Sequence, residues 1–155
     1  MADLYAILIK SWNDAQKEAF AIRKTVFIEE QGVPEEMELD EFDPICQHAL
    51  AYENSRCIGT ARLILPIEAA NRQIARIGRM AVLAPYRKQG VGKSLLSALI
   101  KLGISKDITQ FELHAQLSAI PFYEQLGFIA TGNVYDEAGI AHRDMILQTP
   151  LSQSP

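Results

Sequence analysis

The sequence predicts a mixed α/β (α+β) fold, with one curved, mainly antiparallel sheet flanked by helices. Three observations predict it. The expected elements follow the order β-α-β-β-β-α-β-α-β-β, the chain has 155 residues, and its composition, 48% hydrophobic and 22% charged, is that of an ordinary globular protein. A chain of this length usually builds one core. We therefore expect a single domain over residues 1–149 and a frayed tail over residues 150–155.

The first third of the chain predicts a strand, a helix and an irregular segment. Residues Leu4–Lys10 are mostly aliphatic, which favours a strand. Asn13, with Gln16 three residues later, is typical of a helix start, and apolar residues then recur at helical spacing to about Gln31. A glycine and a proline follow and end the helix. Residues 34–44 have no clean period, so we expect a loop or a broken short helix there.

The middle of the chain predicts a hairpin and a central strand. Residues 48–53 and 57–65 flank a short polar run, as in a hairpin, and residues 74–83 carry apolar side chains on both faces, which favours a central strand. A glycine-bearing turn over residues 85–94 leads directly into a helix. The remaining elements are expected at 111–116 (strand), 118–126 (short helix), 128–134 (strand) and 141–148 (strand).

Composition excludes several classes of protein. No apolar run approaches the ~20 residues of a membrane-spanning helix, and the N-terminus lacks the basic lead and cleavage site of a secretion signal, so we expect a cytoplasmic protein. Cys46 and Cys57 lack the spacing of a metal site or a disulfide framework. The net charge of −4 argues against nucleic acid as the main partner. We therefore expect no metal, no nucleic-acid partner and no membrane partner.

Charge is segregated along the chain. From Thr25 to Asn54 there are nine acidic residues and no Lys or Arg, whereas from Ala69 to Lys106 there are eight basic residues and no Asp or Glu. The basic stretch contains the glycine-bearing turn at the start of a helix, where backbone dipoles favour an anion. We therefore expect an anionic ligand at the basic stretch and a cationic ligand near the acidic one.

Residues 85–94 match three known patterns of phosphate-binding loop to different degrees. The loop of nucleoside triphosphatases needs a glycine where this chain has Arg87, so the Lys93-Ser94 ending is a partial match only. The dinucleotide fingerprint needs a glycine where this chain has Leu95. The pattern Arg/Gln-x-x-Gly-x-Gly/Ala is met fully by Arg87, Gly90 and Gly92, directly after a strand and at the opening of a helix.

On these residues the sequence resembles the GNAT superfamily of acyl-CoA-dependent N-acetyltransferases. Residues Arg79–Gly92 resemble the family's strand and pyrophosphate loop, and Pro121–Phe128 resemble its later helix and turn. The segment Arg23–Pro34 further resembles the small bacterial ElaA-like and YjcF-like branch. The resemblance covers the chain from Leu4 to Leu147 and implies a GNAT-like fold.

The resemblance implies that acetyl-CoA binds at the loop as a co-substrate. Glycine at 90 and 92 lets the backbone approach a ligand, so that successive amides can point at a pyrophosphate. Backbone groups of the preceding strand would pair with the pantetheine amides, and one of them would polarise the thioester carbonyl. The residues expected to bind the co-substrate are Met80, Ala81, Val82, Arg87, Lys88, Gln89, Gly90, Val91, Gly92, Lys93 and Ser94.

By the same resemblance, Tyr123 stands where many members place a general acid that protonates the departing thiolate. A phenol of pKa about 10 can donate to a thiolate of pKa ~8.5. The base is left open: His114 shares one face of a strand with Glu112 and Gln116 and suits proton transfer near neutral pH, and a water relay is the alternative. The other candidates for base or substrate binding are Glu30, His48 and His142.

The function implied by the resemblance is transfer of an acetyl group from acetyl-CoA to a primary amine of a small molecule or peptide, by direct attack in a ternary complex. Two alternatives stay open. One is a non-catalytic acyl-CoA-binding module, and the other is an acetyltransferase acting on aminoacyl-tRNA, which the negative net charge opposes. The acceptor, the acyl chain length and the oligomeric state, for which the family suggests a homodimer, are left open.

Overall fold

The computed structural model describes residues 5–66 and 73–149, so Leu4 and the tail expected over 150–155 lie outside the described residues. Seven strands of the described chain form one sheet in the order β1-β2-β3-β4-β5-β7-β6. The strands are β1 (Ala6–Lys10), β2 (Gln47–Glu53), β3 (Arg56–Ile64), β4 (Ile74–Val82), β5 (Gln110–Gln116), β6 (Ile129–Glu137) and β7 (Ile140–Gln148). The α-helices are α1 (Trp12–Arg23), α2 (Val91–Ser105) and α3 (Ile120–Gln125).

The sheet is mainly antiparallel, as the sequence predicted. Every neighbouring pair of strands is antiparallel except β4 and β5. The element order and the hairpin of β2 and β3 are confirmed, and β4 occupies the middle of the sheet, as its two apolar faces indicated.

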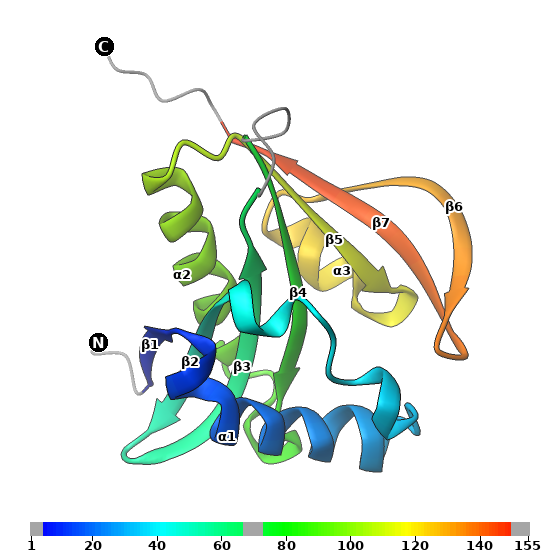
Figure 1. Ribbon diagram of the computed structural model, residues 1–155. Coiled ribbons are helices and arrows are strands. Elements are labelled where there is room, and N and C mark those ends of the chain that lie inside the picture. Colours follow the sequence, from blue (N-terminus) through cyan, green and yellow to red (C-terminus); the bar gives the residue numbers. More distant parts are fainter. Residues whose placement is uncertain (1–4, 67–72, 150–155) are drawn as a thin grey trace.

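Strands β4 and β5 diverge along their length, as Figure 1 shows. Their parallel pairing joins Ile74–Arg76 to Gln110–Glu112 and ends there, although β4 continues to Val82 and β5 to Gln116. On its other side, β4 carries a bulge, because the register with β3 shifts between Thr60 and Arg62. The sheet therefore opens at its centre while each half keeps its own antiparallel ladders.

The helices pack on opposite faces of the sheet because side chains alternate along each strand. Leu50 of β2 packs with Ala15 and Ala19 of α1, whereas its neighbours Ala49 and Ala51 belong to the main core with Leu95 of α2. Helix α1 contacts β2, β3 and β4 and leaves the matching face of β5, β7 and β6 without a helix, as Figure 1 shows. None of the helices in residues 5–66 and 73–149 is long and apolar enough to cross a membrane.

The predicted helix start at Asn13 is wrong. Helix α1 begins at Trp12, and Ser11 occupies the cap position, its carbonyl accepting hydrogen bonds from the amides of Asp14 and Ala15 at 3.1 and 2.9 Å. The α-helix also ends earlier than predicted, at Arg23, and continues as a π-helical segment, η1 (Lys24–Glu30). Such wider turns frequently occur at functional sites, and η1 faces the gap between β4 and β5.

Candidate functional site

A cavity of about 740 Å³ lies where β4 and β5 diverge. Its walls come from η1, β4, the glycine loop (residues 87–93), β5, α3 and the hairpin that joins β6 to β7. Of the residues expected from the sequence, it is lined by Met80, Ala81, Val82, Arg87, Lys88, Gly90, Gly92, Lys93, His114, Tyr123 and His142. Outside its lining, within the described chain, lie Glu30, His48, Gln89, Val91 and Ser94.

The glycine loop presents backbone amides to this cavity. Gly90 has φ +88° and directly precedes α2, a conformation that favours glycine, and no atom lies within 4 Å of the position that a Cβ at Gly90 would take. The first amide of the helix to find a backbone partner is that of Ser94, which donates to the Gly90 carbonyl at 3.0 Å. The preceding amides of Val91–Lys93 are at the positive end of the helix dipole, make no hydrogen bond with another described residue, and suit an anion.

Strand β4 carries its bulge into the cavity wall. Arg79 has φ +50°, which is rare for a residue with a side chain, and it lies opposite the register shift with β3. The Arg79 guanidinium donates to the carbonyls of Met37 and Glu38, both at 3.3 Å, and these bonds help to hold the strained backbone. The backbone groups of Met80 and Val82 point away from β3. Both residues line the cavity and lie beyond Arg76, the last residue of β4 that pairs with β5.

Arg87 does not extend freely towards the cavity. Its Nε donates to the Val82 carbonyl at 2.8 Å, and its two terminal nitrogens each donate to one oxygen of Glu30 at 2.7 Å. The hydrogen bonds from Arg87 hold the pKa of Glu30 below its usual value, and those bonds also raise the pKa of Arg87. Glu30, which the sequence suggested as a substrate ligand, thus ties the end of η1 to the glycine loop.

The other loop side chains have local roles. Gln89 accepts a hydrogen bond from the Tyr5 hydroxyl at 2.6 Å and donates to the Pro85 carbonyl at 3.0 Å. Val91 is buried in the main core, so its side chain packs while its backbone faces the loop. Lys88 and Lys93 line the cavity and supply positive charge beside the free amides.

Tyr123 lies across the cavity from the bulge. Its hydroxyl is 3.9 Å from the sulfur of Met80, and its ring packs edge-on against Phe122 and Phe128. Burial raises the pKa of Tyr123 to about 12, so the phenol is protonated at neutral pH. Phe122 also approaches the glycine loop, since a Cβ at Gly92 would lie 3.3 Å from its ring. The phenol therefore faces the same space as the loop and β4.

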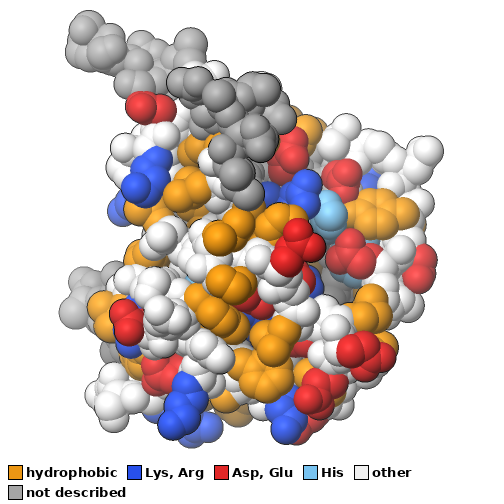
Figure 2. All heavy atoms as spheres, in the orientation of Figure 1, with side chains coloured by type: hydrophobic (Ala, Val, Ile, Leu, Met, Phe, Trp, Pro, Cys, Tyr) orange, Lys and Arg blue, Asp and Glu red, His pale blue; other side chains and the backbone are white. Residues whose placement is uncertain are grey.

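A histidine cluster, defined as His114, Tyr135, Glu137, His142 and Asp144, forms the far wall of the cavity and its rim. His114 Nδ1 lies 3.0 Å from a Glu137 oxygen, and the Tyr135 hydroxyl donates to Asp144 at 2.5 Å. Figure 2 shows histidine and acidic side chains beside a hollow on this side of the molecule. Sequence reasoning found both histidines but missed Glu137, because the hairpin that brings it to β5 is a long-range contact.

His48 is enclosed elsewhere. Its Nε2 lies 3.0 Å from the Asp43 carbonyl, its ring packs against Trp12 at 4.8 Å, and burial lowers its pKa. We therefore do not carry His48 forward as a substrate ligand. Both cysteines pack as small apolar groups, Cys46 fully buried and Cys57 partly so, and burial raises the pKa of each thiol to about 11.

In the acidic segment (residues 34–44), Glu38, Asp40 and Asp43 are engaged by arginines, whereas Glu35, Glu36 and Glu41 are exposed. Arg23, which is 1% exposed, donates to Glu38 at 2.6 Å and to Asp43 at 2.9 Å. Arg62 donates to both oxygens of Asp40, each at 2.7 Å, and to Asp43 at 2.8 Å. Long-range folding brings arginines from other elements onto these acids.

The pKa shifts follow from this ion-pair network. Burial would raise the pKa of Asp40, but hydrogen bonds from Arg62 and its charge outweigh burial and hold that pKa at about 2. At Glu38 burial wins and raises the pKa in spite of Arg23 and Arg79. The network keeps the acidic segment against the wall of the cavity, which Glu38 and Asp40 line.

Comparison with known families identifies this architecture. The family of acetyltransferase (GNAT) domains matches residues 12–149. The chain belongs to the GNAT acetyltransferase family. Among the curated relatives of this GNAT chain, YyaT of Bacillus subtilis is 40% identical over 81% of this chain and 83% of its own length. The uncharacterized N-acetyltransferase YjcF of the same organism is 31% identical over 91% of this chain and 97% of its own length.

Solved structures share the fold of this GNAT chain. A Lactobacillus plantarum protein assigned as an N-acetyltransferase has a TM-score of 0.84 and 31% identity, covering 96% of this chain and 100% of that one. Escherichia coli ElaA has a TM-score of 0.81 and 24% identity, covering 93% and 99%. These matches confirm the resemblance to ElaA-like and YjcF-like proteins. The acyl-homoserine lactone synthase BjaI, solved with isopentyl-CoA, has the same fold, with a TM-score of 0.77, 20% identity, and 94% and 84% coverage.

Proposed function

We propose that this GNAT protein transfers an acetyl group from acetyl-CoA to a primary amine of a small molecule or peptide, by direct attack in a ternary complex. One observation carries the proposal. A single cavity joins the free amides of the glycine loop, the unpaired edge of β4, the buried phenol of Tyr123 and the histidine cluster. These are the parts that acyl transfer from a thioester to an amine requires.

The glycine loop and the adjoining edge of β4, which form the donor end of the cavity, fit acetyl-CoA. The amides of Val91–Lys93 suit a diphosphate, and open space lies where a side chain at Gly90 would stand. Lys88 and Lys93 add charge, and the edge of β4 near Met80 offers backbone groups for the pantetheine amides. Support also comes from BjaI, which binds an acyl-CoA on the same fold.

The chain's own groups can carry the proton transfers. An amine of pKa about 10.4 must lose a proton before its nitrogen attacks the thioester carbonyl. As the C–S bond breaks, the phenol of Tyr123, which is protonated at neutral pH, gives its proton to the thiolate. A backbone amide near the β4 bulge polarises the carbonyl. The histidine cluster, in which His114 is the base suggested by the sequence, takes the proton from the amine.

Calorimetry with coenzyme A, followed by thiol release from acetyl-CoA with a library of amines that includes polyamines and peptides, tests this function. We expect one binding site and turnover with at least one amine. Binding without turnover across the library would favour a non-catalytic module, and no uptake of coenzyme A by folded protein would contradict the proposal. Acetylation of charged tRNA in the same assay would favour the third hypothesis. The cytoplasmic location stays a prediction.

A further inference from the structure

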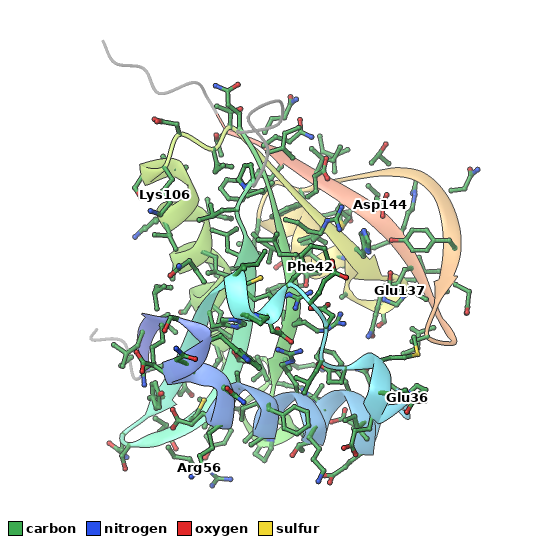
Figure 3. The ribbon with its side chains drawn as sticks, in the orientation of Figure 1. Glu36, Phe42, Arg56, Lys106, Glu137 and Asp144 are labelled. Atoms are coloured by element: carbon green, nitrogen blue, oxygen red, sulfur yellow. The ribbon has the colours of Figure 1, made fainter. Side chains whose placement is uncertain are left out.

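The hairpin between β6 and β7 is shaped to hold Glu137 at the cavity. Ala138 and Gly139 both have positive φ, +53° and +80°, which matches the twist of a two-residue hairpin turn. The turn is fixed by Asp136, whose carboxylate accepts a hydrogen bond from the Gly139 amide at 3.2 Å. Figure 3 shows Glu137 near this tip and Asp144 farther along β7. Ala138 is one of the few residues with a side chain to adopt positive φ here, and this strain is typical of functional sites.

His142 presents a basic nitrogen to the cavity. Its side chain is 8% exposed, and its Nδ1 lies 2.7 Å from the Ile140 carbonyl oxygen. A carbonyl only accepts hydrogen bonds, so Nδ1 must carry the hydrogen and the neutral ring has its lone pair on Nε2. Nε2 makes no hydrogen bond with any described residue, and the residue lines the cavity. A nine-tenths buried ring in the cavity wall is therefore left with an unused acceptor, 3.8 Å from an oxygen of Glu137, which also lines the cavity.

Glu137 lies between the two histidines. One of its oxygens is 3.0 Å from His114 Nδ1, and the other is 3.8 Å from His142 Nε2. In the neutral state this second pair consists of two acceptors facing each other, which attract nothing without a donor. An ammonium group supplies three N–H donors and a positive charge, so it satisfies both at once.

The rest of this end of the cavity offers apolar side chains and arginines. Its apolar lining is Met37, Phe42, Ile64 and Ile140. Arg62 and Arg79 are engaged by Asp40 and Glu38, and Arg76 also lines the cavity. Because the other acids of the lining are thus paired, an acceptor with an apolar body fits better than one with a second positive charge.

We infer that the acceptor is a primary amine with an apolar body and no second positive charge, that its ammonium binds between Glu137 and His142, and that His142 is the catalytic base. This inference rests on the proposed function and refines it, since His114 becomes a positioning residue. His114 already engages Glu137 and is 38% exposed, whereas His142 is 8% exposed and its Nε2 makes no hydrogen bond with any described residue. Once protonated, His142 pairs with Glu137, which stabilises the charge that the transfer creates.

Side chains of the cavity account for every proton that the reaction transfers. His142 Nε2 takes one proton from the ammonium, and the freed lone pair forms the N–C bond while the C–S bond breaks. Tyr123 gives its proton to the thiolate and regains the second proton of the amine nitrogen, so amide and thiol form with one proton released. That proton passes from His142 to Glu137, whose side chain is 39% exposed, and from there to solvent, while His114 holds the other oxygen of Glu137.

The test uses hexylamine as acceptor and compares Glu137→Gln and His142→Gln with the wild type. Glu137→Gln should raise the KM for hexylamine at least ~10-fold, and His142→Gln should lower kcat at least ~100-fold. Glu112→Gln is the matched control: it makes the same chemical change on β5, outside the cavity lining, and should leave both constants unchanged. Calorimetry with coenzyme A should give the same Kd within two-fold for all variants, about the uncertainty of the comparison.

The split between kcat and the KM for hexylamine gives a second readout. His114 holds one oxygen of Glu137 through its Nδ1 at 3.0 Å. His114→Gln should therefore raise the KM for hexylamine more than it lowers kcat, as Glu137→Gln does and His142→Gln does not, which separates a positioning residue from the base.

Binding of the uncharged isostere keeps the inference testable if a variant fails to fold. In the wild type, the inhibition constant of 1-hexanol should be at least ~10-fold higher than the dissociation constant of hexylammonium. The inference is overturned by equal binding of the two, by full kcat in His142→Gln, or by a wild type that binds coenzyme A but does not acetylate hexylamine. Absence of coenzyme A binding would instead overturn the proposed function itself.

Discussion

At one end of the cavity, the chemical groups come from one continuous segment, β4 followed by the glycine loop and the first turn of α2. At the other end, they come from β5, β6 and β7, with the acidic segment against the same wall. The first end uses mainly backbone amides, and the second uses side chains whose charges are balanced by one another. The end at the glycine loop is therefore determined by local backbone geometry, whereas the end at β5, β6 and β7 forms only when the sheet folds.

Electrostatics divides the two ends in the same way. At the glycine loop, the helix dipole and two lysines create unbalanced positive potential, which suits an anion. At the other end, Asp40 and Glu38 are neutralised by arginines, so Glu137 is the acid left facing a basic nitrogen rather than a guanidinium. Binding of an anionic donor is therefore expected to tolerate changes at the histidine cluster, and acceptor binding to depend on single side chains.

The largest effect is expected from Gly90→Glu. A side chain there must adopt φ +88°, at a cost of about 1–2 kcal/mol, and its carboxylate would face the bound diphosphate. We expect affinity for coenzyme A to fall about 1,000-fold by calorimetry. Gly132→Glu is the control, because Gly132 has φ +78° and open space around it but lies on β6, and it should keep the affinity. Retained affinity in Gly90→Glu would show that the diphosphate binds elsewhere.

Much of the fold and the donor end could be predicted because their signals are local. The turn over residues 85–94 combines glycine spacing with a preceding strand and a following helix, and the structure places Gly90 at the predicted junction. The central position of β4 followed from its apolar faces. The start of α1 was misplaced because Ser11 and Asn13 are both good capping residues and only the carbonyl of Ser11 accepts the first bonds.

The acceptor end could not be predicted because its partners are far apart in the sequence. Arg23, Arg62 and Arg79 each lie outside the acidic stretch, so counting charges along the chain could not show that acids of this stretch are ion-paired in the folded protein. Glu137 offered no motif, and its meeting with His114 depends on the register of β5 with β7 and of β7 with β6. The acceptor end is therefore determined by pairing between strands and not by the spacing of residues along the sequence.

A second expected effect concerns Tyr123, which we propose gives its proton to the thiolate of coenzyme A during the transfer. Tyr123→Phe removes only a hydroxyl whose one hydrogen bond with a described residue is the long one to the Met80 sulfur, so the fold and the affinity for coenzyme A should be unchanged. We expect kcat to fall about 100-fold in the thiol-release assay. Because the pKa of Tyr123 is about 12, its deprotonation should not lower the wild-type rate until the pH rises well above 10.

Tyr86→Phe is the matched control for this change. Tyr86 packs against the main core, lies outside the cavity lining and is not expected to affect kcat. If Tyr123→Phe kept the wild-type kcat, the thiolate would take its proton from water or another group, and the phenol would serve packing alone.

The smallest expected effect tests the ion pairs beside the acceptor end. In the folded protein the pKa of Asp40 is about 2, below the 3.8 of an unperturbed aspartate, so the unfolded chain binds the proton more readily. The stability that Asp40 contributes is therefore present above pH 3.8 and is lost as the pH falls towards 2. Because the carboxylate is partly exposed, we expect Asp40→Asn to cost roughly 1 kcal/mol near neutral pH in denaturant titrations.

The pH dependence distinguishes this ion pair from general acid unfolding. Glu41→Gln removes an exposed acid from the same segment and should change neither the stability at neutral pH nor its decline in acid. Asp40→Asn should be less stable than the wild type at pH 6, and most of this difference should be lost by pH 2, where about half of the wild-type carboxylate is itself protonated. A constant difference between the two proteins from pH 6 to pH 2 would mean that Asp40 acts by shape and hydrogen bonding, and that the charge of Arg62 is balanced by Asp43 alone.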